Sequence, residues 1–458
     1  MDKSNWMNVV MKTAVSGLDI SETGLDANMI LNAVNEENVG NQNETLSVDE
    51  EYNLWRSNVP LMYDFVSETE LVWPSLTIQW LPHGKGPISR NIQQMILGTH
   101  TSGEEPNYLK IAAITLPDEV VDSDEDDTDG ISIDRNDQVY ENDNSKDKED
   151  YVQSNIRIMQ KFQHEEEVNR ARYMPQNPNI IATINGLGLV SIFDRDSDQC
   201  KAIKTLKYHK DNGYGLSFNP NWEGYLLSGS DDHTIALWDL NKDAKPVHIW
   251  GEGIHKDIVN DCKWNEFNKN IFGSVSEDLT LKIHDLRSND RHNFDSSISF
   301  SSECVFNTIA FSKHSEYLFG AAGTDSYVHL FDMRKIQEPL HSMSGHQDAV
   351  TNLEFFEHKD GILMSSGSDR RAIIWDINEI GKEQVFDDAE DASPEVVMIH
   401  GGHKSPVNDM SINSNIPWLM ATCEENNIVQ VWKGSKRLPT IGGLPKLNET
   451  LYRELLDN

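Results

Sequence analysis

The sequence predicts an all-β fold, a seven-bladed β-propeller with an N-terminal helix and a short C-terminal helix. Three observations support this prediction. A β-rich run that ends in a ring-bearing side chain and a polar residue recurs at intervals of 44 to 57 residues. A turn signal of Gly or Ser with Asp precedes most of these runs. Residues 74–433 suffice for seven units of about 45 residues, the usual size of a propeller blade.

The repeated runs share one register, and the polar residue is Asp in all but the last of them. The six runs are LVSIFD at 189–194, TIALWD at 234–239, TLKIHD at 280–285, YVHLFD at 327–332, AIIWD at 372–376 and IVQVWK at 428–433. A His lies upstream of four of them, at His209, His255, His346 and His403. This is the pattern of WD repeats. We expect the His, the turn Asp, a strand Ser or Thr and the strand Trp to form a buried hydrogen-bonded network in each blade.

Six repeats leave one blade to be filled, and the N-terminal segments fill it. Residues 73–80, 94–98 and 108–116 have the composition of strands. A four-stranded blade cannot bury both of its faces alone, so blades stack radially against their neighbours. We therefore expect the propeller over residues 71–433, with the strand near Thr77 joining the last blade and closing the ring.

The chain is strongly acidic. Its 458 residues hold 75 Asp and Glu against 39 Lys and Arg, for a formal net charge of −36 and a pI near 4.7. This argues against binding to nucleic acid or to a membrane surface, because phosphates and anionic lipids require concentrated Lys and Arg. A basic protein partner is favoured instead.

Two segments are predicted to be disordered. Residues 118–150 hold 15 acidic residues against three basic ones, and such a segment cannot bury enough apolar area to order itself. This acidic insert interrupts the first blade between Leu116 and Ile156, either as a solvated loop or as a weak attractor of basic partners. Residues 1–46 are rich in Asn and acidic residues and are expected to form a disordered extension.

The cysteines and the hydropathy favour a chain of the cytoplasm and nucleus. Cys200, Cys262, Cys304 and Cys423 are widely spaced and form no CxxC pair, so we expect small buried side chains without disulfides, metal or cofactor. No apolar run approaches the roughly 20 residues that span a bilayer, and the N-terminus lacks a signal peptide.

Helices are expected at both flanks of the propeller. Ser47 and Glu50 form a capping-box pattern, and apolar residues follow it at helical spacing, which predicts an N-terminal helical segment over residues 47–70. An apolar patch with Leu61, Met62 and Phe65 continues it. The tail at 434–458 contains a short helix candidate at 448–456. The flanking helices either cover the side of the propeller or form one wall of a groove.

The longest interval between repeats, 57 residues, contains an acidic loop at 379–399. Four acids stand there beside the apolar run of residues 395–399. They are Asp387, Asp388, Glu390 and Asp391. An acidic rim beside an apolar floor suits a basic amphipathic helix.

A second candidate surface lies where the repeats begin. In five repeats Asn follows a β-branched or aromatic residue, and the remaining repeat has Tyr214. The five are Asn169, Asn260, Asn307, Asn352 and Asn408. A polar ring at the mouth of the propeller channel would follow, which with Glu167 could hold a basic extended peptide. The alternative is that these Asn side chains end loops and cap turns.

Several motifs resemble the histone-binding WD-repeat family. They are SVDEEYNLW at 47–55, LVWPSLTIQWLP at 71–82, HEEEVNRARYMP at 164–175, DDHT at 231–234, DAED at 388–391 and IHGGH at 399–403. The resemblance covers about 47–433. The family includes retinoblastoma-binding proteins, one of the subunits of a chromatin assembly factor and the non-catalytic subunit of the type B histone acetyltransferase, and the last of these is the most similar.

The resemblance implies two histone sites and no cofactor. A groove between the N-terminal helix and the acidic loop would take the first helix of histone H4. Its apolar contacts would be Leu61, Met62, Phe65, Val396 and Ile399, and the four loop acids would pair with Lys and Arg. The propeller top, with Glu167, Tyr214 and the five Asn, would take the histone H3 tail. Asn212 stands there where relatives often carry an acid.

The resemblance further implies a scaffold that presents new histone to a catalytic acetyltransferase subunit, without catalytic residues of its own. The recurrence of His209, Asp231 and Trp238 by blade favours a structural role for such residues. Two alternatives remain. One is a histone chaperone subunit of a chromatin assembly or histone deacetylase complex. The other is a WD-repeat adaptor for ubiquitin ligation or for the escort of ribosomal proteins.

Overall fold

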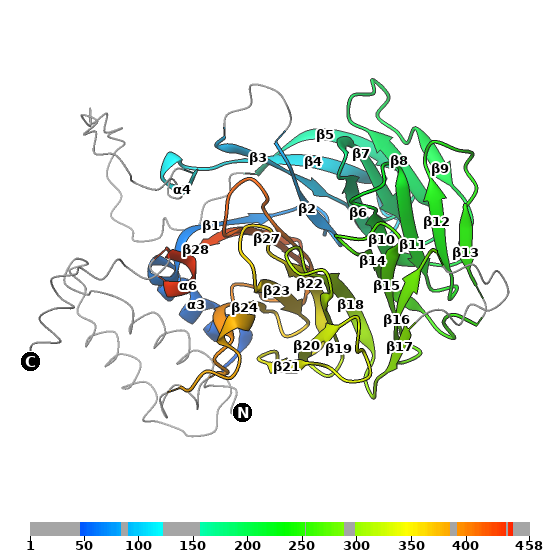
Figure 1. Cartoon of the computed structure of the whole chain (residues 1–458). Coiled ribbons are helices and arrows are strands. Elements are labelled where there is room, and N and C mark those ends of the chain that lie inside the picture. The colour runs from blue at the N-terminus through cyan, green and yellow to red at the C-terminus, as the bar shows by residue number, and fades with distance from the viewer. Residues whose placement is uncertain are drawn as a thin grey trace, which may run out of the picture.

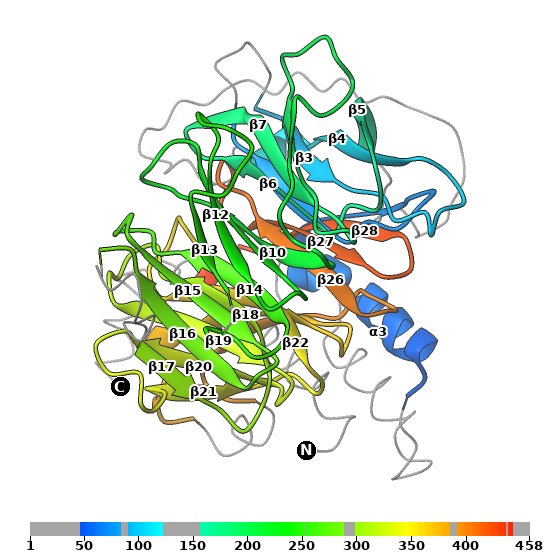
Figure 2. The same ribbon diagram turned by 90° about the vertical axis from the view of Figure 1, so that its right-hand side faces the viewer.

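The computed structural model describes residues 46–83, 90–121, 156–251, 253–287, 298–384, 392–436 and 438–442. In these residues the strands form seven four-stranded antiparallel sheets. The sheets are arranged as blades around a common axis (Figures 1 and 2). The predicted seven-bladed propeller is therefore confirmed.

The first three blades lie in chain order, and in each the four strands pair consecutively. Blade 1 is β2 (Ile78–Leu81), β3 (Ile92–Leu97), β4 (Asn107–Thr115) and β5 (Ile156–His164). Blade 2 is β6 (Arg170–Met174), β7 (Asn177–Ile184), β8 (Val190–Asp194) and β9 (Lys204–Leu206). Blade 3 is β10 (Gly213–Phe218), β11 (Tyr225–Ser230), β12 (Ile235–Asp239) and β13 (His248–Trp250).

Blades 4 to 6 follow the same rule, and blade 7 departs from it. Blade 4 is β14 (Val259–Trp264), β15 (Ile271–Ser276), β16 (Thr280–Asp285) and β17 (Ile298–Ser301). Blade 5 is β18 (Phe306–Phe311), β19 (Leu318–Gly323), β20 (Tyr327–Asp332) and β21 (His341–Ser344). Blade 6 is β22 (Val350–Phe355), β23 (Ile362–Gly367), β24 (Ala372–Asp376) and β25 (Val396–His400). Blade 7 is β26 (Val407–Ile412), β27 (Leu419–Glu424), β28 (Ile428–Gly434) and β1 (Tyr63–Glu70).

Blade 7 closes the ring in a way that the sequence did not predict. Its outermost strand is β1, which pairs with β28 from Tyr63 opposite Gly434 to Glu70 opposite Ile428. The expected closure by the strand near Thr77 is wrong, because that segment leads into β2, which pairs within blade 1. The last third of the predicted helical segment 47–70 is therefore a strand, and the propeller begins at residue 63.

The N-terminal helix α3 (Val48–Met62) forms where its capping signal predicts. Ser47 accepts a hydrogen bond from the backbone of Glu50, and the Glu50 side chain accepts one from the backbone of Ser47. Acidic residues in the first turn also suit the positive end of the helix dipole. The buried face consists of residues at helical spacing, namely Tyr52, Trp55, Val59 and Met62. Pro60 lies inside the last turn, and the chain leaves the helix extended at Tyr63.

The predicted His–Asp–Ser–Trp network is present. In blade 3, His209 Nε2 lies 2.7 Å from Ser228 Oγ, and Trp238 donates to the same oxygen at 2.8 Å. Burial would raise the pKa of Asp232, but hydrogen bonds from His209 and Thr234 outweigh it and lower the pKa. His346 makes the equivalent network in blade 6.

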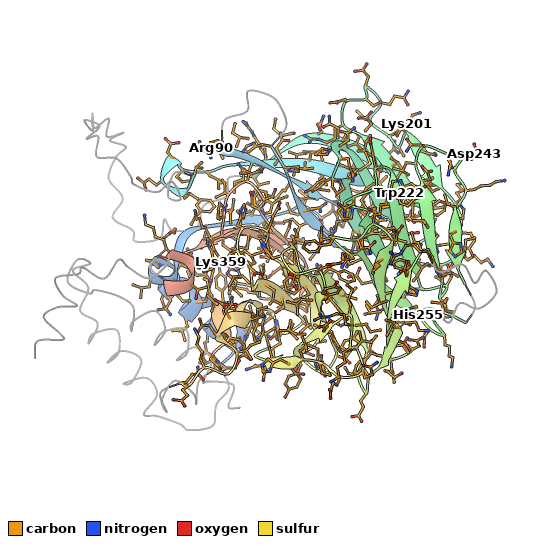
Figure 3. The ribbon with its side chains drawn as sticks, in the orientation of Figure 1. Arg90, Lys201, Trp222, Asp243, His255 and Lys359 are labelled. Atoms are coloured by element: carbon orange, nitrogen blue, oxygen red, sulfur yellow. The ribbon has the colours of Figure 1, made fainter. Side chains whose placement is uncertain are left out.

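Blade 4 repeats the network with one exchange. His255, labelled in Figure 3, lies 2.7 Å from Ser274 Oγ and 3.1 Å from Asp278. His284 takes the place of the Trp, 2.8 Å from the same serine oxygen. Burial lowers the pKa of His284 well below its usual value, so this ring is neutral.

The structure corrects two further expectations. The acidic insert begins after, not at, residue 118, because α4 (Asp118–Val121) buries Val120 and Val121. The cysteines are not all buried, since Cys200 is exposed and Cys304 is half-buried. At the C-terminus, α6 (Pro439–Gly442) accepts a hydrogen bond at Thr440 O from Lys359, which Figure 3 labels beside it. Residues 1–45 and 122–155 and the helix expected at 448–456 lie outside the described residues.

Candidate functional site

The helix α3 is held against blades 6 and 7 by a buried row of polar side chains. Trp55 Nε1 donates to Tyr63 Oη at 3.0 Å, and Tyr63 Oη lies 2.9 Å from His400 Nδ1. His400 Nε2 lies 2.8 Å from Gln430 Oε1, and Gln430 Nε2 donates to Glu68 at 2.8 Å. The row therefore joins helix α3 to β1, β25 and β28.

The proton positions in this row follow from its chemistry. The Glu68 carboxylate only accepts, so Gln430 must present its NH₂ group there and its oxygen to His400. Burial and the neighbouring His403 lower the pKa of His400 well below its usual value, so the ring carries one proton, on Nε2. Burial raises the pKa of Tyr63, whose O–H therefore donates to His400 Nδ1. Every member of the row is satisfied, which makes α3 a fixed wall.

Close packing reinforces the polar row. His400 stacks on Trp432 with ring centroids 4.3 Å apart, and Trp55 meets the edge of His400 at 5.5 Å. A Cβ on Gly402 would lie 2.5 Å from the Trp55 ring, so only Gly fits beneath the helix. Burial and the Glu68 carboxylate raise the pKa of Tyr52 to about 12.

An apolar strip remains at the surface beside this wall. Its members are half-buried and pack against the same core cluster as the buried face of α3. They come from α3, from the 3₁₀ helix η3 (Ile377–Glu379) and the residue after it, from β25 and from α6. We define the apolar strip as Leu54, Leu61, Ile377, Ile380, Val396, Val397 and Ile441. Figure 1 shows α3 and α6 together beside β24 and β28, and Ser435 donates to Met62 O between them.

The predicted apolar contacts divide into three groups. Leu61 and Val396 belong to the apolar strip. Met62 and Ile399 are core residues, only 4% and 5% exposed. Phe65 packs against a different cluster, with Leu71 and Ile156, because it points to the face of β1 opposite Val66. The structure does not bring Phe65 together with Leu61.

Five of the seven strip members were not predicted as contacts, namely Leu54, Ile377, Ile380, Val397 and Ile441. Leu54 stands seven residues before Leu61 and therefore on the same face of α3. Val397 neighbours Val396 at the start of β25. The heptad spacing from Leu61 is the signal that identifies Leu54.

The described residues on either side of the acidic loop lie close in sequence to members of the strip. The described residues end at Gln384, shortly after η3, and begin again at Ala392, just before β25. Both ends of the loop thus adjoin Ile380 and Val396. Asp387, Asp388, Glu390 and Asp391 lie outside the described residues.

The second predicted surface is a ring of side chains at the bulges of the innermost strands. Asn169, Asn260 and Asn307 each donate through Nδ2 to the backbone carbonyl of the first innermost-strand residue in the next blade, at 2.9 to 3.0 Å. Thr351 makes the equivalent bond, to Val407 O at 2.8 Å. These bonds tie neighbouring blades together.

Asn352 does not belong to this ring. The ladder of β22 has its bulge between Val350 and Asn352, so Thr351 is the ring residue of blade 6. Asn352 is buried one step below, where it donates to Asp409, which also binds Arg172 through two bonds of 3.0 and 3.1 Å. The one-residue error arose because Thr351–Asn352 resembles the Val–Asn pairs of the other repeats.

The remaining ring residues are not all satisfied. Tyr214 accepts a hydrogen bond from Asn212 at 2.7 Å, and Asn169 donates to Asn212 at 2.5 Å. Asn408 Nδ2 is buried and has no hydrogen-bond partner among the residues that the structure describes. Glu167 lies against the Gly186 backbone, where an added Cβ would meet its carboxylate at 1.9 Å.

Two further acids lie at this end. The expected structural role of Asp231 beside His209 is wrong, because His209 contacts Asp232 instead, and Glu277 was not predicted at all. Asp231 and Glu277 each precede the acid of a blade network, Asp232 or Asp278. Burial, together with Asp211 and Glu277, raises the pKa of Asp231. Its Oδ1 is buried and lacks a donor within the described part of the chain. The doubled acids of the turns at 231–232 and 277–278 are the signal that could have revealed them.

The other end of the channel holds a polar cavity of about 340 Å³. Arg172, Lys263 and Lys313 line it together with Glu266, Glu354 and Glu357. Lys313 lies 3.8 Å from Glu354, so the charges of both signs balance within the cavity.

These features define a seven-bladed WD-repeat propeller with an N-terminal helix packed on its side, and comparison with known proteins identifies its family. The chain belongs to the histone-binding WD-repeat family. Residues 50–118 match the family model that describes the histone-binding protein RBBP4 or one of the subunits of the CAF1 complex. Residues 199–239, 337–376 and 394–433 match the WD domain, G-beta repeat.

Full-length relatives place the chain more narrowly. It is 53% identical over 411 residues to the histone acetyltransferase type B subunit 2 of Candida glabrata, covering 89% of this chain and 93% of that protein. The proteins of the same description from Kluyveromyces lactis and Eremothecium gossypii are 53% and 54% identical, each over 86% of this chain and over 93% and 87% of their own lengths. Among the described residues, no helix has the length and apolar character needed to span a membrane.

Proposed function

We propose that the chain is the histone-binding, non-catalytic subunit of a type B histone acetyltransferase. It binds histone H4, and also the H3 tail, and presents newly made histone to the catalytic subunit for acetylation of H4 lysines. The observation that carries the proposal is the apolar strip beside a fixed α3, in a chain 53% identical to type B subunit 2 proteins.

The apolar strip and the acidic loop together suit a basic amphipathic helix. The strip supplies half-buried Leu, Ile and Val side chains from several elements around one core cluster. The loop that starts and ends beside the strip carries four carboxylates in the sequence. An amphipathic helix laid on the strip would turn its Lys and Arg toward these carboxylates. The first helix of histone H4 is the occupant that we propose.

Charge reversal in the loop tests this site. We expect the substitutions Asp387→Lys, Asp388→Lys, Glu390→Lys and Asp391→Lys to abolish pull-down of an H4 first-helix peptide. The matched control reverses Asp124, Glu125, Asp126 and Asp127 in the acidic insert, which changes the net charge equally. We expect the control to retain most of the binding. Unchanged binding in the loop variant, or equal loss in both, would contradict the proposed site.

The mouth of the propeller suits an extended basic peptide. Glu167, Tyr214 and Asn212 lie together there, and Asp231 offers a buried oxygen without a donor in the described residues. A Lys or Arg of the H3 tail would supply that donor and a positive charge beside Asp231 and Glu277. The ring amides contribute less than expected from sequence, because several already bind the next blade.

A scaffolding role without catalysis follows from the use of the polar side chains. The His, Asp and Ser residues that would suggest a catalytic triad bind one another within the blades. The protein would contribute the position of the histone, and its enzymatic partner the chemistry. Because new histones are made in the cytoplasm and used in the nucleus, we propose that the chain works in both.

A second candidate function is favoured by the family model, whose description includes a component of the CAF1 complex. The same histone site would serve a chaperone in chromatin assembly or in a histone deacetylase complex. Mass spectrometry of partners co-purified separately from cytosol and nucleus discriminates the two. An acetyltransferase in the cytosolic fraction is expected. Its absence would favour the second candidate, and a basic client other than a histone would contradict both.

A further inference from the structure

Blade 5 lacks the hydrogen-bonded network that holds blades 3, 4 and 6. In blades 3, 4 and 6 the network His stands 23 residues before the turn Asp, and the strand Ser stands four residues before it. The Trp or His of the network stands six residues after the turn Asp. Counted from the turn acid Asp325, these positions in blade 5 hold Ser302, Ala321 and Phe331. The polar side chains at this turn therefore need another explanation.

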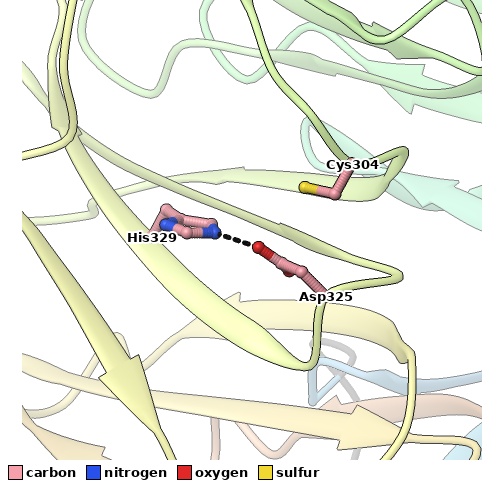
Figure 4. A group of neighbouring side chains, drawn as sticks. All are labelled: Cys304, Asp325 and His329. Carbon is pink, nitrogen blue, oxygen red and sulfur yellow. Dashed lines mark hydrogen bonds and ion pairs between the residues drawn. The ribbon is translucent and has the colours of Figure 1, made fainter.

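A different trio of side chains gathers at the turn. Cys304 comes from the loop before β18, Asp325 from the turn between β19 and β20, and His329 from β20 itself (Figure 4). His329 Nε2 lies 2.8 Å from Asp325 Oδ2. One ligand atom of each residue, counting Cys304 Sγ, lies within 4.8 Å of the other two. All three residues are half-buried, so the group is open to solvent on one side.

The surrounding contacts orient these groups. His329 Nδ1 lies 2.8 Å from Ser342 Oγ, which fixes the ring and leaves Nε2 toward Asp325 and Cys304. Such a hydrogen bond on the far nitrogen is the usual support of a metal-binding histidine. Ser302 Oγ lies 3.0 Å from Cys304 Sγ and accepts from the Cys304 backbone at 3.1 Å, which sets the loop.

We propose that Cys304, Asp325 and His329 form a zinc site, with water in the fourth position. A thiolate, an imidazole and a carboxylate together select Zn²⁺ over Mg²⁺ or Ca²⁺, which prefer oxygen ligands alone. Zinc bonds of about 2.0 to 2.3 Å at tetrahedral angles place ligand atoms about 3.3 to 3.8 Å apart. The three side chains would adopt these separations if the His329–Asp325 distance increased by about half an ångström and the Cys304 thiol moved toward that pair.

The three proposed zinc ligands are not among the residues of the histone surfaces that we propose, although Cys304 stands three residues before the ring residue Asn307. The site joins the loop, the turn and a strand of blade 5. A bound metal would therefore cross-link these segments of blade 5, as the hydrogen-bonded network does in blades 3, 4 and 6. Sequence spacing does not reveal it, since the ligands stand 21 and four residues apart without a CxxC or HxxH pattern.

Metal titration of the purified full-length chain tests the proposal. We expect one Zn²⁺ per chain in competition with a chromogenic chelator, and a thiolate-to-metal absorption band when Co²⁺ is used. Cys304→Ser should remove the Co²⁺ band, and His329→Gln should weaken Zn²⁺ binding at least tenfold. The matched controls are Cys200→Ser and His233→Asn, which alter an exposed thiol and an exposed imidazole elsewhere. Equal binding by the ligand variants and the controls would overturn the site.

A second measurement uses the unaltered protein and is independent of any folding defect. Zn²⁺ should slow the alkylation of Cys304, followed by mass spectrometry, at least tenfold, while the rate at Cys200 stays unchanged as an internal reference. Mg²⁺ at the same concentration should protect neither thiol. Protection of both thiols, or of neither, by Zn²⁺ would overturn the proposal.

Discussion

The side of the propeller and its mouth, the two surfaces at which we propose that a basic partner binds, differ in the groups that they leave exposed or without partners. At the side, Trp55, Tyr63, His400 and Gln430 complete every polar bond, and apolar area remains exposed. At the mouth, the Tyr214 ring is exposed, and buried polar atoms such as Asp231 Oδ1 have no hydrogen-bond partner among the described residues. The side therefore suits a helix with an apolar face, and the mouth suits an extended cationic chain.

The side wall depends most on Trp55. We expect Trp55→Ala to lower the free energy of unfolding by about 3 to 5 kcal/mol, because it removes a buried ring and leaves a cavity. Hydrogen exchange should show α3 detached while blades 2 to 4 keep their protection. Arg56→Ala, on the exposed face of the same helix, is the control and should cost little. Retained protection of α3 in Trp55→Ala would mean that the wall is not anchored through this ring.

Acid should weaken the wall and blade 4 through their buried histidines. Burial depresses the folded pKa of His284 and His400, whereas in the unfolded chain a His titrates near 6.5. Below that pH the unfolded chain gains protons that the folded chain does not, so stability falls as the pH falls. At pH 5.5 each residue should cost on the order of 1 kcal/mol relative to neutral pH.

A single substitution isolates the contribution of His284 to this loss of stability in acid. His284→Trp restores the ring that blades 3 and 6 carry at Trp238 and Trp375, and should reduce the pH-dependent loss measured by denaturant unfolding at pH 7.5 and 5.5. His233→Asn, at an exposed turn, should leave the loss unchanged. If the His284→Trp variant lost as much stability at pH 5.5 as the unaltered protein, His284 would be excluded as a source of the acid sensitivity.

The apolar strip should matter for binding more than for folding. Leu61→Asp is expected to weaken binding of an H4 first-helix peptide at least tenfold, because a carboxylate would be buried under the apolar face of the ligand. Val72→Asp is the matched control, since Val72 is an apolar residue 83% exposed outside the strip. Isothermal titration gives both affinities, and circular dichroism checks the fold. Equal affinity in both variants would remove the strip from the site.

The mouth should show the smallest effect. Asp231→Asn combined with Glu277→Gln should weaken binding of an H3 tail peptide about two- to fivefold, as expected for partly solvated ion pairs. Binding of H4 should not change. A loss of H4 binding in this variant would show that the two surfaces are not independent.

The sequence predicted the parts of the molecule that repeat. The period, the register of the blade runs and the His–Asp–Ser–Trp network follow from local pattern, and the capping box of Ser47 and Glu50 marked the start of α3. The errors lie where chain-distant residues meet. The pairing of β1 with β28, the separation of Phe65 from Leu61 and the approach of Cys304 to His329 depend on how the ring closes and how loops fold back. Asn352 was misplaced because a bulge shifts the register by one residue.

Photo-crosslinking tests the central claim most directly, that the side wall of α3 and the apolar strip receive the H4 helix. A photoreactive amino acid is placed in the full-length chain at Leu61, in the strip, or at Val72, outside it. We predict that histone H4 crosslinks from position 61 through its first helix, that excess first-helix peptide suppresses the product, and that position 72 gives none. Equal crosslinking from both positions, or crosslinking from position 72 alone, would contradict the account.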